Sequence, residues 1–484
     1  MKDLTSRVLN TAQTRGATYA DVRMVNRTHQ NVIVKNGRVE TLEQNESQGF
    51  GVRVIVDGAW GFAASSRTEW SDVDAVVSRA IAIARASAMT RHRELRLGPP
   101  ESHRDSYRSP YRSDPFMVPM SDKINLLLQA DREMQRMKKP GVNLVTQGEL
   151  QFVRENKIFA STEGAQIDQE IVESGCEISA MATNDTGEVQ NRTYPWGRHQ
   201  QTRGFEFILE QDLVGNAPRV AEEAVQLLTA DPCPILDATT IILTGNQVAL
   251  QVHESCGHPI ELDRVLGSEA SYAGTSFLTP DKLNNFYYGS ELVNITADAT
   301  IPGGLGTFAY DDEGVPAQRA EIVRDGRFVG YMTSRETSQE LGLGRSNGTM
   351  RADGWNRIPL IRMTNVSLLP GTWRLDDLIA DTEYGILFDT NRSWSIDDKR
   401  LNFQFGTEAA WEIKGGKKTR LLKNPIYTGI TPTFWRSCDA ICNSDHWVVW
   451  GVPNCGKGQP PQVMHTGHGA APARFRNVRV FTKG

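Results

Sequence analysis

The stretch VHESCGHP, residues 252–259, places two histidines and one glutamate within six consecutive positions. No other segment of the chain concentrates as much chemistry. An apolar run at 240–243 precedes it and predicts a buried strand. Apolar residues then recur between 248 and 252, so we expect a helix that begins near Thr244 or Asn246 and leads into the motif.

The spacing of the two histidines, His253 and His258, is unusual for a metal site. The common zinc-protease motif separates its histidines by four residues, which brings both to one face of a helix. When the histidines are five residues apart, their side chains point about 140° apart on a regular α-helix. That is too far to share one ion comfortably. Gly257 and Pro259 both oppose helix continuation. We therefore expect the helix to end, or to widen by a bulge, near Cys256, with His258 returning from a loop toward His253.

Two histidines make an incomplete catalytic zinc site, because such sites normally have three protein ligands and a water. Cys455 stands out by its context, a glycine-rich segment after the apolar strand expected at 447–450. We expect a loop there, and we expect Lys457 and free loop amides to lower the pKa of the thiol. Judged alone, such a cysteine is more often a buried structural thiol. Cys256 is not expected to be a ligand, because it would strain the short helix that carries both histidines.

Other histidines and cysteines near the end of the chain are weaker candidates. Cys438, Cys442 and His446 follow one another at intervals of four and could suggest a second metal. On a helix the outer two would lie about 12 Å apart along the axis, so packing is the favoured interpretation. His465 and His468 are expected on a polar loop, where they could line the site, although a solvated loop is the more frequent outcome.

The histidine motif at 253–258, the acidic Glu261 and Asp263 after it, and the late segment 455–459 resemble the TldD/PmbA family of metalloproteases. The resemblance extends over most of the chain and is most specific at the histidine motif. It implies that His253, His258 and Cys455 bind Zn²⁺.

The resemblance also implies a role for Glu254, as the general base of a zinc-dependent peptidase. The implied substrates are unfolded or extended peptides, cut at a site enclosed between subunits. The implied assembly is a homodimer, or a heterodimer with a TldD/PmbA paralogue that lacks the zinc motif. One alternative is a non-catalytic peptide-binding or scaffold subunit of such a dimer, which would not need Glu254 and the three ligands together. A metal hydrolase that acts on a non-peptide amide is another.

Composition excludes several classes of protein. The net charge is only −5, so the chain has no electrostatic footprint for nucleic acid. Hydrophobic residues make up 39% of the chain, and they form no run of about 18 that would predict a membrane span. The six cysteines are scattered and do not predict a disulfide framework, so we expect a reducing, cytoplasmic setting.

The pattern of elements predicts an α+β fold. In the N-terminal part we expect a strand at 20–25 and two hairpins, which turn at the dipeptides Asn36-Gly37 and Asp57-Gly58. Helices are expected at about 71–88, 123–136 and 217–229, an exposed proline-rich connection at 97–119, and strands over 142–210.

The best domain boundary is the segment Asp-Pro-Cys-Pro at 231–234. We therefore expect an N-terminal α+β domain at 1–232, with a sub-boundary in the connection at 97–119. A strand-rich C-terminal domain at 236–484 would carry the metal-site helix.

Overall fold

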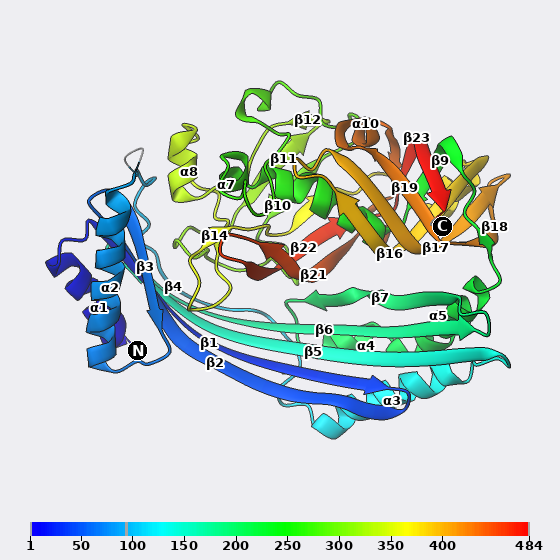
Figure 1. Cartoon of the computed structure of the whole chain (residues 1–484), viewed down its shortest axis with the longest axis horizontal. Coiled ribbons are helices and arrows are strands. Elements are labelled where there is room, and N and C mark those ends of the chain that lie inside the picture. Colours follow the sequence, from blue (N-terminus) through cyan, green and yellow to red (C-terminus); the bar gives the residue numbers. More distant parts are fainter. Residues whose placement is uncertain (1, 92–94, 483–484) are drawn as a thin grey trace.

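A long curved antiparallel sheet supports the rest of the molecule, and the C-terminal half lies on its concave face (Figure 1). The structure is a computed structural model that describes residues 2–91 and 95–482. Ion pairs join the two parts: Lys157 lies 2.8 Å from Asp312, and Arg53 lies 3.5 Å from Glu313. The α+β fold class expected from the sequence is confirmed. No helix among the described residues is both long enough and apolar enough to cross a membrane.

The curved sheet has seven strands in the order β3-β2-β1-β5-β6-β4, with β7 also paired to β6. Both predicted hairpin turns are confirmed: φ is positive at Asn36, Gly37, Asp57 and Gly58, as a type I′ turn requires. The strands are β1 Tyr19–Lys35, β2 Arg38–Val56, β3 Ala59–Ser65, β4 Arg104–Arg108, β5 Val142–Ser161, β6 Gln166–Asn184 and β7 Val189–Gln201.

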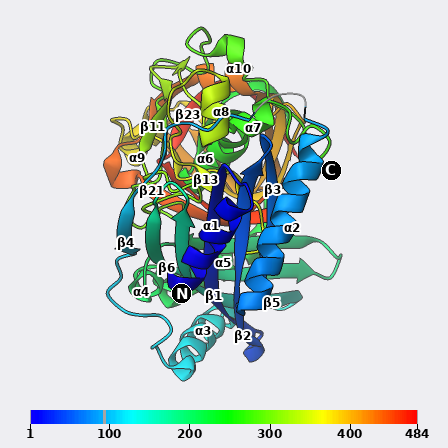
Figure 2. The ribbon, with the colours of Figure 1, turned by 90° about the vertical axis from the view of Figure 1, so that its left-hand side faces the viewer.

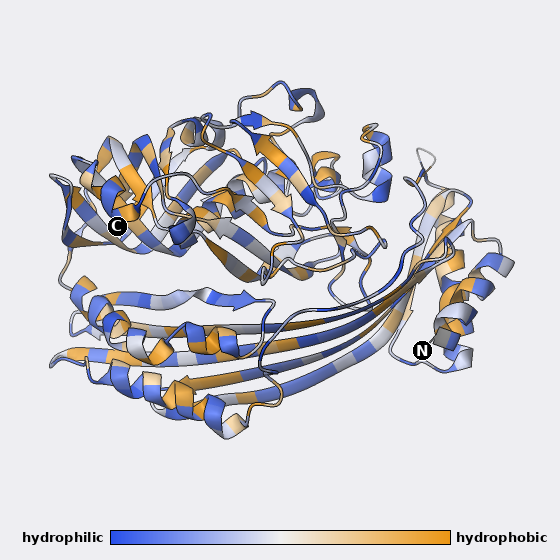
Figure 3. Ribbon diagram, turned by 180° about the vertical axis from the view of Figure 1, so that it is seen from behind, coloured by the Kyte–Doolittle hydropathy of each residue, from blue (hydrophilic) through white to orange (hydrophobic). Residues whose placement is uncertain are grey.

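The first strand is much longer than predicted, because β1 continues beyond residue 25 to Lys35. Its polar middle pairs with β2 on one side and β5 on the other, so its backbone groups are satisfied within the sheet. Side-chain pairs across the strands add support, as in the ion pair of 2.5 Å between Arg27 and Glu155. Hydrophobic and hydrophilic residues are interspersed along these strands (Figure 3).

Helices cover the sheet where its residues are apolar. On the convex face α3 (Met120–Gln135) and α5 (Leu213–Leu227) pack against β5 and β6, with Leu127 and Phe152 among the buried residues of this core. At one end α1 (Lys2–Thr14) and α2 (Trp70–Ala88) pack on β1 to β3 (Figure 2). The short helix α4 (Glu206–Glu210) occupies residues that were predicted to be strand.

The proline-rich segment at 97–119 is not simply an exposed connection. Residues 104–108 form β4, which pairs in parallel with β6, and Glu101 and Ser109 beside it are buried. Prolines flank this five-residue stretch without interrupting it, so its backbone is free to join the sheet edge.

The C-terminal half is built around a barrel. Strand pairing runs β16-β9-β23-β19-β17 and closes through a direct pairing of β17 with β16. Aromatic side chains such as Phe403, Tyr427 and Phe475 belong to its core. The strands of this sheet are β8 Asp231–Pro232, β9 Leu236–Leu243, β16 Tyr384–Ile396, β17 Asn402–Lys414, β18 Lys417–Lys423, β19 Pro425–Ile430, β20 Cys438–Ile441 and β23 Ala473–Thr482.

Smaller sheets and helices fill the space between the barrel and the curved sheet. The hairpin β21–β22 contacts β7 on one side and β15 and the motif helix α6 on the other. The remaining strands are β10 Ile295–Asp298, β11 Arg319–Arg324, β12 Arg327–Phe328, β13 Met350–Arg351, β14 Leu360–Ile361, β15 Val366–Leu368, β21 Val448–Lys457 and β22 Gln462–Ala470. The remaining helices are α6 Gly245–Val252, α7 Leu262–Val265, α8 Arg335–Glu340, α9 Leu375–Ala380 and α10 Thr431–Arg436.

Candidate metal centre

The motif lies on a helix that changes its winding at the first histidine. Thr244 is the N-terminal capping residue of α6, and every residue of this helix is buried. At His253 the chain passes into a π-helical turn, His253–Gly257, and the N–H of His258 donates to the carbonyl oxygen of His253. Because a π-helical turn bonds residue i to residue i+5, the wider turn brings residues five apart onto the same side.

The predicted widening near Cys256 is confirmed, but the predicted return of His258 from a loop is wrong. His258 has φ −66° and ψ −41°, a right-handed helical conformation, and it begins a tight turn, His258–Ile260. Pro259 lies in the first positions of that turn, where its missing N–H is not needed. Gly257 packs closely against Met363, since a Cβ atom there would lie 2.2 Å from the Sδ atom of Met363.

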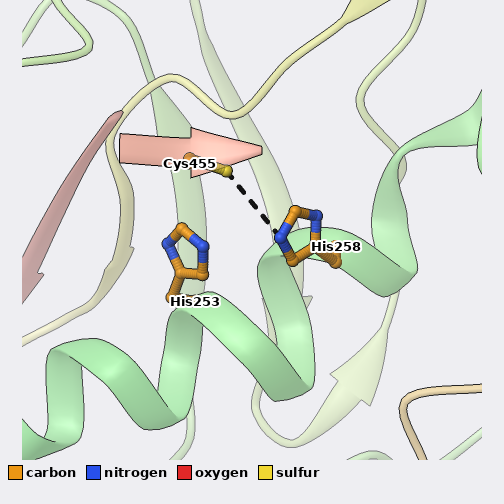
Figure 4. Close-up of side chains that lie close together, drawn as sticks. All are labelled: His253, His258 and Cys455. Carbon is orange, nitrogen blue, oxygen red and sulfur yellow. Dashed lines mark hydrogen bonds between the residues drawn. The ribbon is translucent and has the colours of Figure 1, made fainter. Parts of the chain in front are cut away.

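The two motif histidines and Cys455 meet in one buried cluster (Figure 4). The Sγ atom of Cys455 lies 3.8 Å from Nε2 of His258, and ligand atoms of all three residues lie within 4.8 Å of one another. The side chains are almost inaccessible: His253, His258 and Cys455 are 4%, 5% and 3% exposed. The sequence-predicted ligands are therefore brought together, although they come from segments about two hundred residues apart.

The donor set of this cluster fits Zn²⁺. Two imidazole nitrogens and one thiolate are ligands that zinc prefers, and three protein ligands leave the fourth position for a water. In a tetrahedral zinc site the nitrogen and sulfur ligand atoms lie about 3.5 Å apart, close to the 3.8 Å between His258 and Cys455.

Cys455 lies on strand β21 and not on the loop expected from its glycine-rich context. The pairing register of β21 with β22 shifts between Val452 and Cys455, a bulge of the kind that redirects side chains. Burial raises the pKa of the Cys455 thiol, but the interactions of the thiol with His258 and Arg362 more than offset it, so the pKa is lowered. The Nη2 atom of Arg362 donates to the carbonyl oxygen of Cys455 at 2.5 Å.

Lys457 was expected to lower the pKa of Cys455, and the structure gives it other partners. Its Nζ atom donates to Asp263 at 2.7 Å and to the carbonyl oxygen of Ile361 at 2.6 Å. It also lies 3.4 Å from Glu261. Lys457 thus balances the negative charge of the acidic residues that follow the motif.

Each motif histidine has an outer partner at its Nδ1 atom. His258 Nδ1 lies 3.0 Å from Oε2 of Glu261, and His253 Nδ1 lies 2.8 Å from Nε2 of His468. Both Nε2 atoms are left for a metal. Burial lowers the pKa of His253, and it lowers the pKa of His258 well below its ordinary value, so both rings are held in the neutral form that ligates metals.

Glu254 lies beside the ligands and is buried, and its carboxylate has a cationic partner. The Nη1 atom of Arg400 donates to Oε2 of Glu254 at 2.6 Å. Arg400 occupies the turn between β16 and β17 with φ +62°. Sequence reasoning missed Arg400, because nothing in its local sequence signals this contact, whereas Glu261 was recognisable as an acidic residue just after the motif.

The expectation that His465 and His468 lie on a solvated loop is wrong, because both belong to strand β22. His468 is fully buried and faces His253. His465 points to the curved sheet, where its Nδ1 atom lies 2.6 Å from Oε2 of Glu173 on β6. Glycine neighbours had made this segment resemble a loop.

The other cysteines are packed away from the cluster. Cys256 belongs to the hydrophobic core, and burial raises the pKa of its thiol to about 12. Cys438 and Cys442 are buried at strand β20 rather than on the helix considered for them. The Nε2 atom of His446 accepts a hydrogen bond from the Leu375 N–H at 3.2 Å.

Comparison with family models covers three successive parts of the chain. Residues 20–84 match the PmbA/TldA metallopeptidase domain 1, residues 113–230 match the central domain, and residues 237–481 match the C-terminal domain. The cluster of His253, His258 and Cys455 lies within the C-terminal match.

Similar proteins span almost the whole chain. A metalloprotease of Methanocaldococcus jannaschii is 28% identical over 91% of this chain and 92% of its own length. A zinc metalloprotease TldD homolog of Saccharolobus solfataricus is 22% identical over 94% and 95%. Among solved structures, TldE of Thermococcus kodakarensis has a TM-score of 0.74 with 16% identity, over 99% of this chain and all of its own, and so shares the fold.

Proposed function

The chain belongs to the PmbA/TldD metallopeptidase family, and we propose that it is a zinc-dependent peptidase that hydrolyses unfolded or extended peptides. One observation carries the proposal: the buried cluster of His253, His258 and Cys455, with the carboxylate Glu254 next to the first ligand. A non-catalytic scaffold would have no use for this combination of residues.

Zinc bound by His253, His258 and Cys455 would lower the pKa of a coordinated water toward neutrality and polarise the scissile carbonyl. Glu254 takes the proton from the attacking water and delivers it to the leaving amine. Its Oε2 atom is held by Arg400, so the carboxylate is oriented before the substrate arrives.

The burial of the site supports the choice of substrate. Each proposed ligand is at most 5% exposed, so a loop on the surface of a compact folded protein has no direct route to the metal. An extended peptide is thin enough to be threaded to such a site, and it can pair its main chain with a strand edge whatever its side chains. We infer that short or unfolded peptides are cut and that compact domains are spared.

The proposal extends to the assembly of the protein and to its location in the cell. We propose a dimer, either a homodimer or a heterodimer with a TldD/PmbA paralogue, in which the partner helps to enclose the site. We propose that the protein works in the cytoplasm, since all six of its cysteines are free thiols.

The experiment that tests the function combines metal analysis with digestion of an unstructured peptide. The purified protein should contain one zinc per chain and cut the peptide, a chelator should stop cleavage, and added zinc should restore it. A tightly folded domain should remain intact under the same conditions. A protein that binds zinc and peptide but never cuts would instead be the scaffold subunit of a dimer.

A further inference from the structure

We propose that His468 is a positioning residue: it sets the tautomer of His253, so that the Nδ1 atom of His253 carries the proton and its Nε2 atom is free to bind the metal. The inference rests on the metal site proposed above. It assigns a role to a histidine that no motif marks, on a strand distant in sequence from the histidine helix.

His468 has hydrogen-bond partners at both ring nitrogens, and the Thr466 hydroxyl also lies 3.3 Å from its Nε2 atom. The Nδ1 atom of His468 lies 2.9 Å from the carbonyl oxygen of Val366 on β15. Its other ring nitrogen, Nε2, lies 2.8 Å from Nδ1 of His253. The two rings meet nearly edge to face, with centroids 4.8 Å apart and planes inclined by 72°.

The direction of these hydrogen bonds follows from the contact of His468 with the carbonyl oxygen of Val366. A carbonyl oxygen only accepts hydrogen bonds, so the Nδ1 atom of His468 must carry a proton. A neutral imidazole has one protonated nitrogen, so the Nε2 atom of His468 is an acceptor and His253 donates to it from Nδ1. The Nε2 atom of His253 then has a free lone pair, which is what a metal requires.

The opposite direction would disable the ligand. If His468 carried protons on both nitrogens, it would donate to His253, and the proton of His253 would move to Nε2, where the metal should bind. That state places a charged imidazole in a fully buried position, where no carboxylate lies within hydrogen-bond distance among the described residues. Such a charge is costly, so the structure favours the direction proposed here.

The surroundings hold His468 in place. A Cβ atom at Gly467 would lie 2.1 Å from Asn365, and one at Gly469 would lie 1.9 Å from Trp447, so both neighbours must be glycine for this close packing. The N–H of Gly469 also donates to Ser367. The glycines on both sides of His468 therefore allow this part of the strand to pack closely against its neighbours.

The test compares variants at two histidines of the same strand. His468→Leu removes the acceptor, and His468→Gln offers an amide oxygen to His253 and an amide N–H to Val366. His465→Leu is the matched control, since His465 lies three residues earlier and points to the curved sheet. Zinc affinity is measured by competition with a chromophoric chelator, which requires no turnover.

We expect His468→Leu to bind zinc about 10- to 100-fold more weakly, the usual effect of removing an outer partner of a ligand. His468→Gln and His465→Leu should stay within about threefold of the parent. A parental affinity in folded His468→Leu would overturn the proposal. So would an equal loss in His468→Leu and His465→Leu, which would indicate a general packing defect.

A second readout needs no variant at His468. In zinc-free protein, ¹⁵N NMR of the imidazoles should show His253 protonated at Nδ1, and protonation at Nε2 would overturn the proposal. His253→Ala separates this inference from the site on which it rests. If His253→Ala keeps zinc, the proposed ligand set is wrong; if it loses zinc while His468→Leu retains it, only the role of His468 is wrong.

Discussion

The Nη1 atom of Arg400 lies 2.6 Å from the Oε2 atom of Glu254, although 146 residues separate them in the chain. Arg400 belongs to the turn between two barrel strands, and Glu254 to the π-helical turn that carries the histidines. A residue of the barrel therefore orients the carboxylate of Glu254. The contact fixes the orientation of the Glu254 carboxylate, which follows His253 directly in sequence.

The ligand set predicts which substitutions remove zinc. His253→Ala, His258→Ala and Cys455→Ala should each lose most of the bound metal, because three ligands leave no redundancy. Cys256→Ala is the control within the motif and should keep its zinc. Elemental analysis after dialysis measures the content, and loss in Cys256→Ala with retention in Cys455→Ala would show that the third ligand is misassigned.

Glu254→Gln separates binding of the metal from its use. The amide keeps the size of the carboxylate and one oxygen acceptor for Arg400, but it is no base. We expect parental zinc content and peptide affinity, with turnover lower by at least about 100-fold. Zinc content and turnover should be measured on one preparation; near-parental activity would exclude Glu254 from the mechanism, and loss of zinc would make it a ligand.

The pair of Arg400 and Glu254 also predicts a stability effect. Arg400→Met would leave a buried carboxylate without its cation, which costs roughly 3 kcal/mol of the free energy of unfolding. The double variant Glu254→Gln/Arg400→Met should recover part of that loss, because it buries no charge. Urea denaturation of the metal-free proteins measures both, and strictly additive effects would contradict the coupling.

An exposed ion pair provides the comparison for that experiment. Arg7 lies 2.5 Å from Asp74 on the surface of the first two helices. Solvent screens surface pairs of this kind, so Arg7→Met should change the unfolding free energy far less than Arg400→Met.

His199 predicts a loss of stability in acid. It lies on β7, and burial lowers the pKa of its imidazole to about 3. Its Nδ1 atom accepts the N–H of Gly451 on β21 at 3.1 Å, a bond that only the unprotonated nitrogen can make. Because the folded-state pKa lies below the unfolded value of about 6.5, this stabilisation is present above pH 6.5 and is lost as the pH falls toward 3.

The slope of that loss is about 1.4 kcal/mol per pH unit. His199→Asn keeps an acceptor for Gly451 but does not titrate. The difference in unfolding free energy between His199→Asn and the parent should therefore shift by about 3 kcal/mol in favour of the variant when the pH is lowered from 7.5 to 4.5. Urea denaturation of metal-free protein at both pH values measures the difference, and a constant difference would mean that His199 is not the titrating group.

Short-range sequence patterns were sufficient to predict much of the secondary structure. The type I′ turns at Asn36 and Asp57 were predictable because the local backbone needs positive φ there, and only a few residue types tolerate it. The helices α2 and α3 were predictable from apolar periodicity. The polar middle of β1 was not, because pairing on both sides, rather than propensity, makes it a strand.

The sequence by itself determined the ingredients of the site: a histidine pair with an adjacent glutamate, a helix that must end or widen near Cys256, and a late cysteine. The tertiary structure alone decided what surrounds them. Arg400 and His468 come from a barrel turn and a distant strand, and their contacts with Glu254 and His253 depend on how those elements pack. Local sequence encodes backbone preference and burial, whereas contacts between distant segments exist only after the core has formed and fixed their separation.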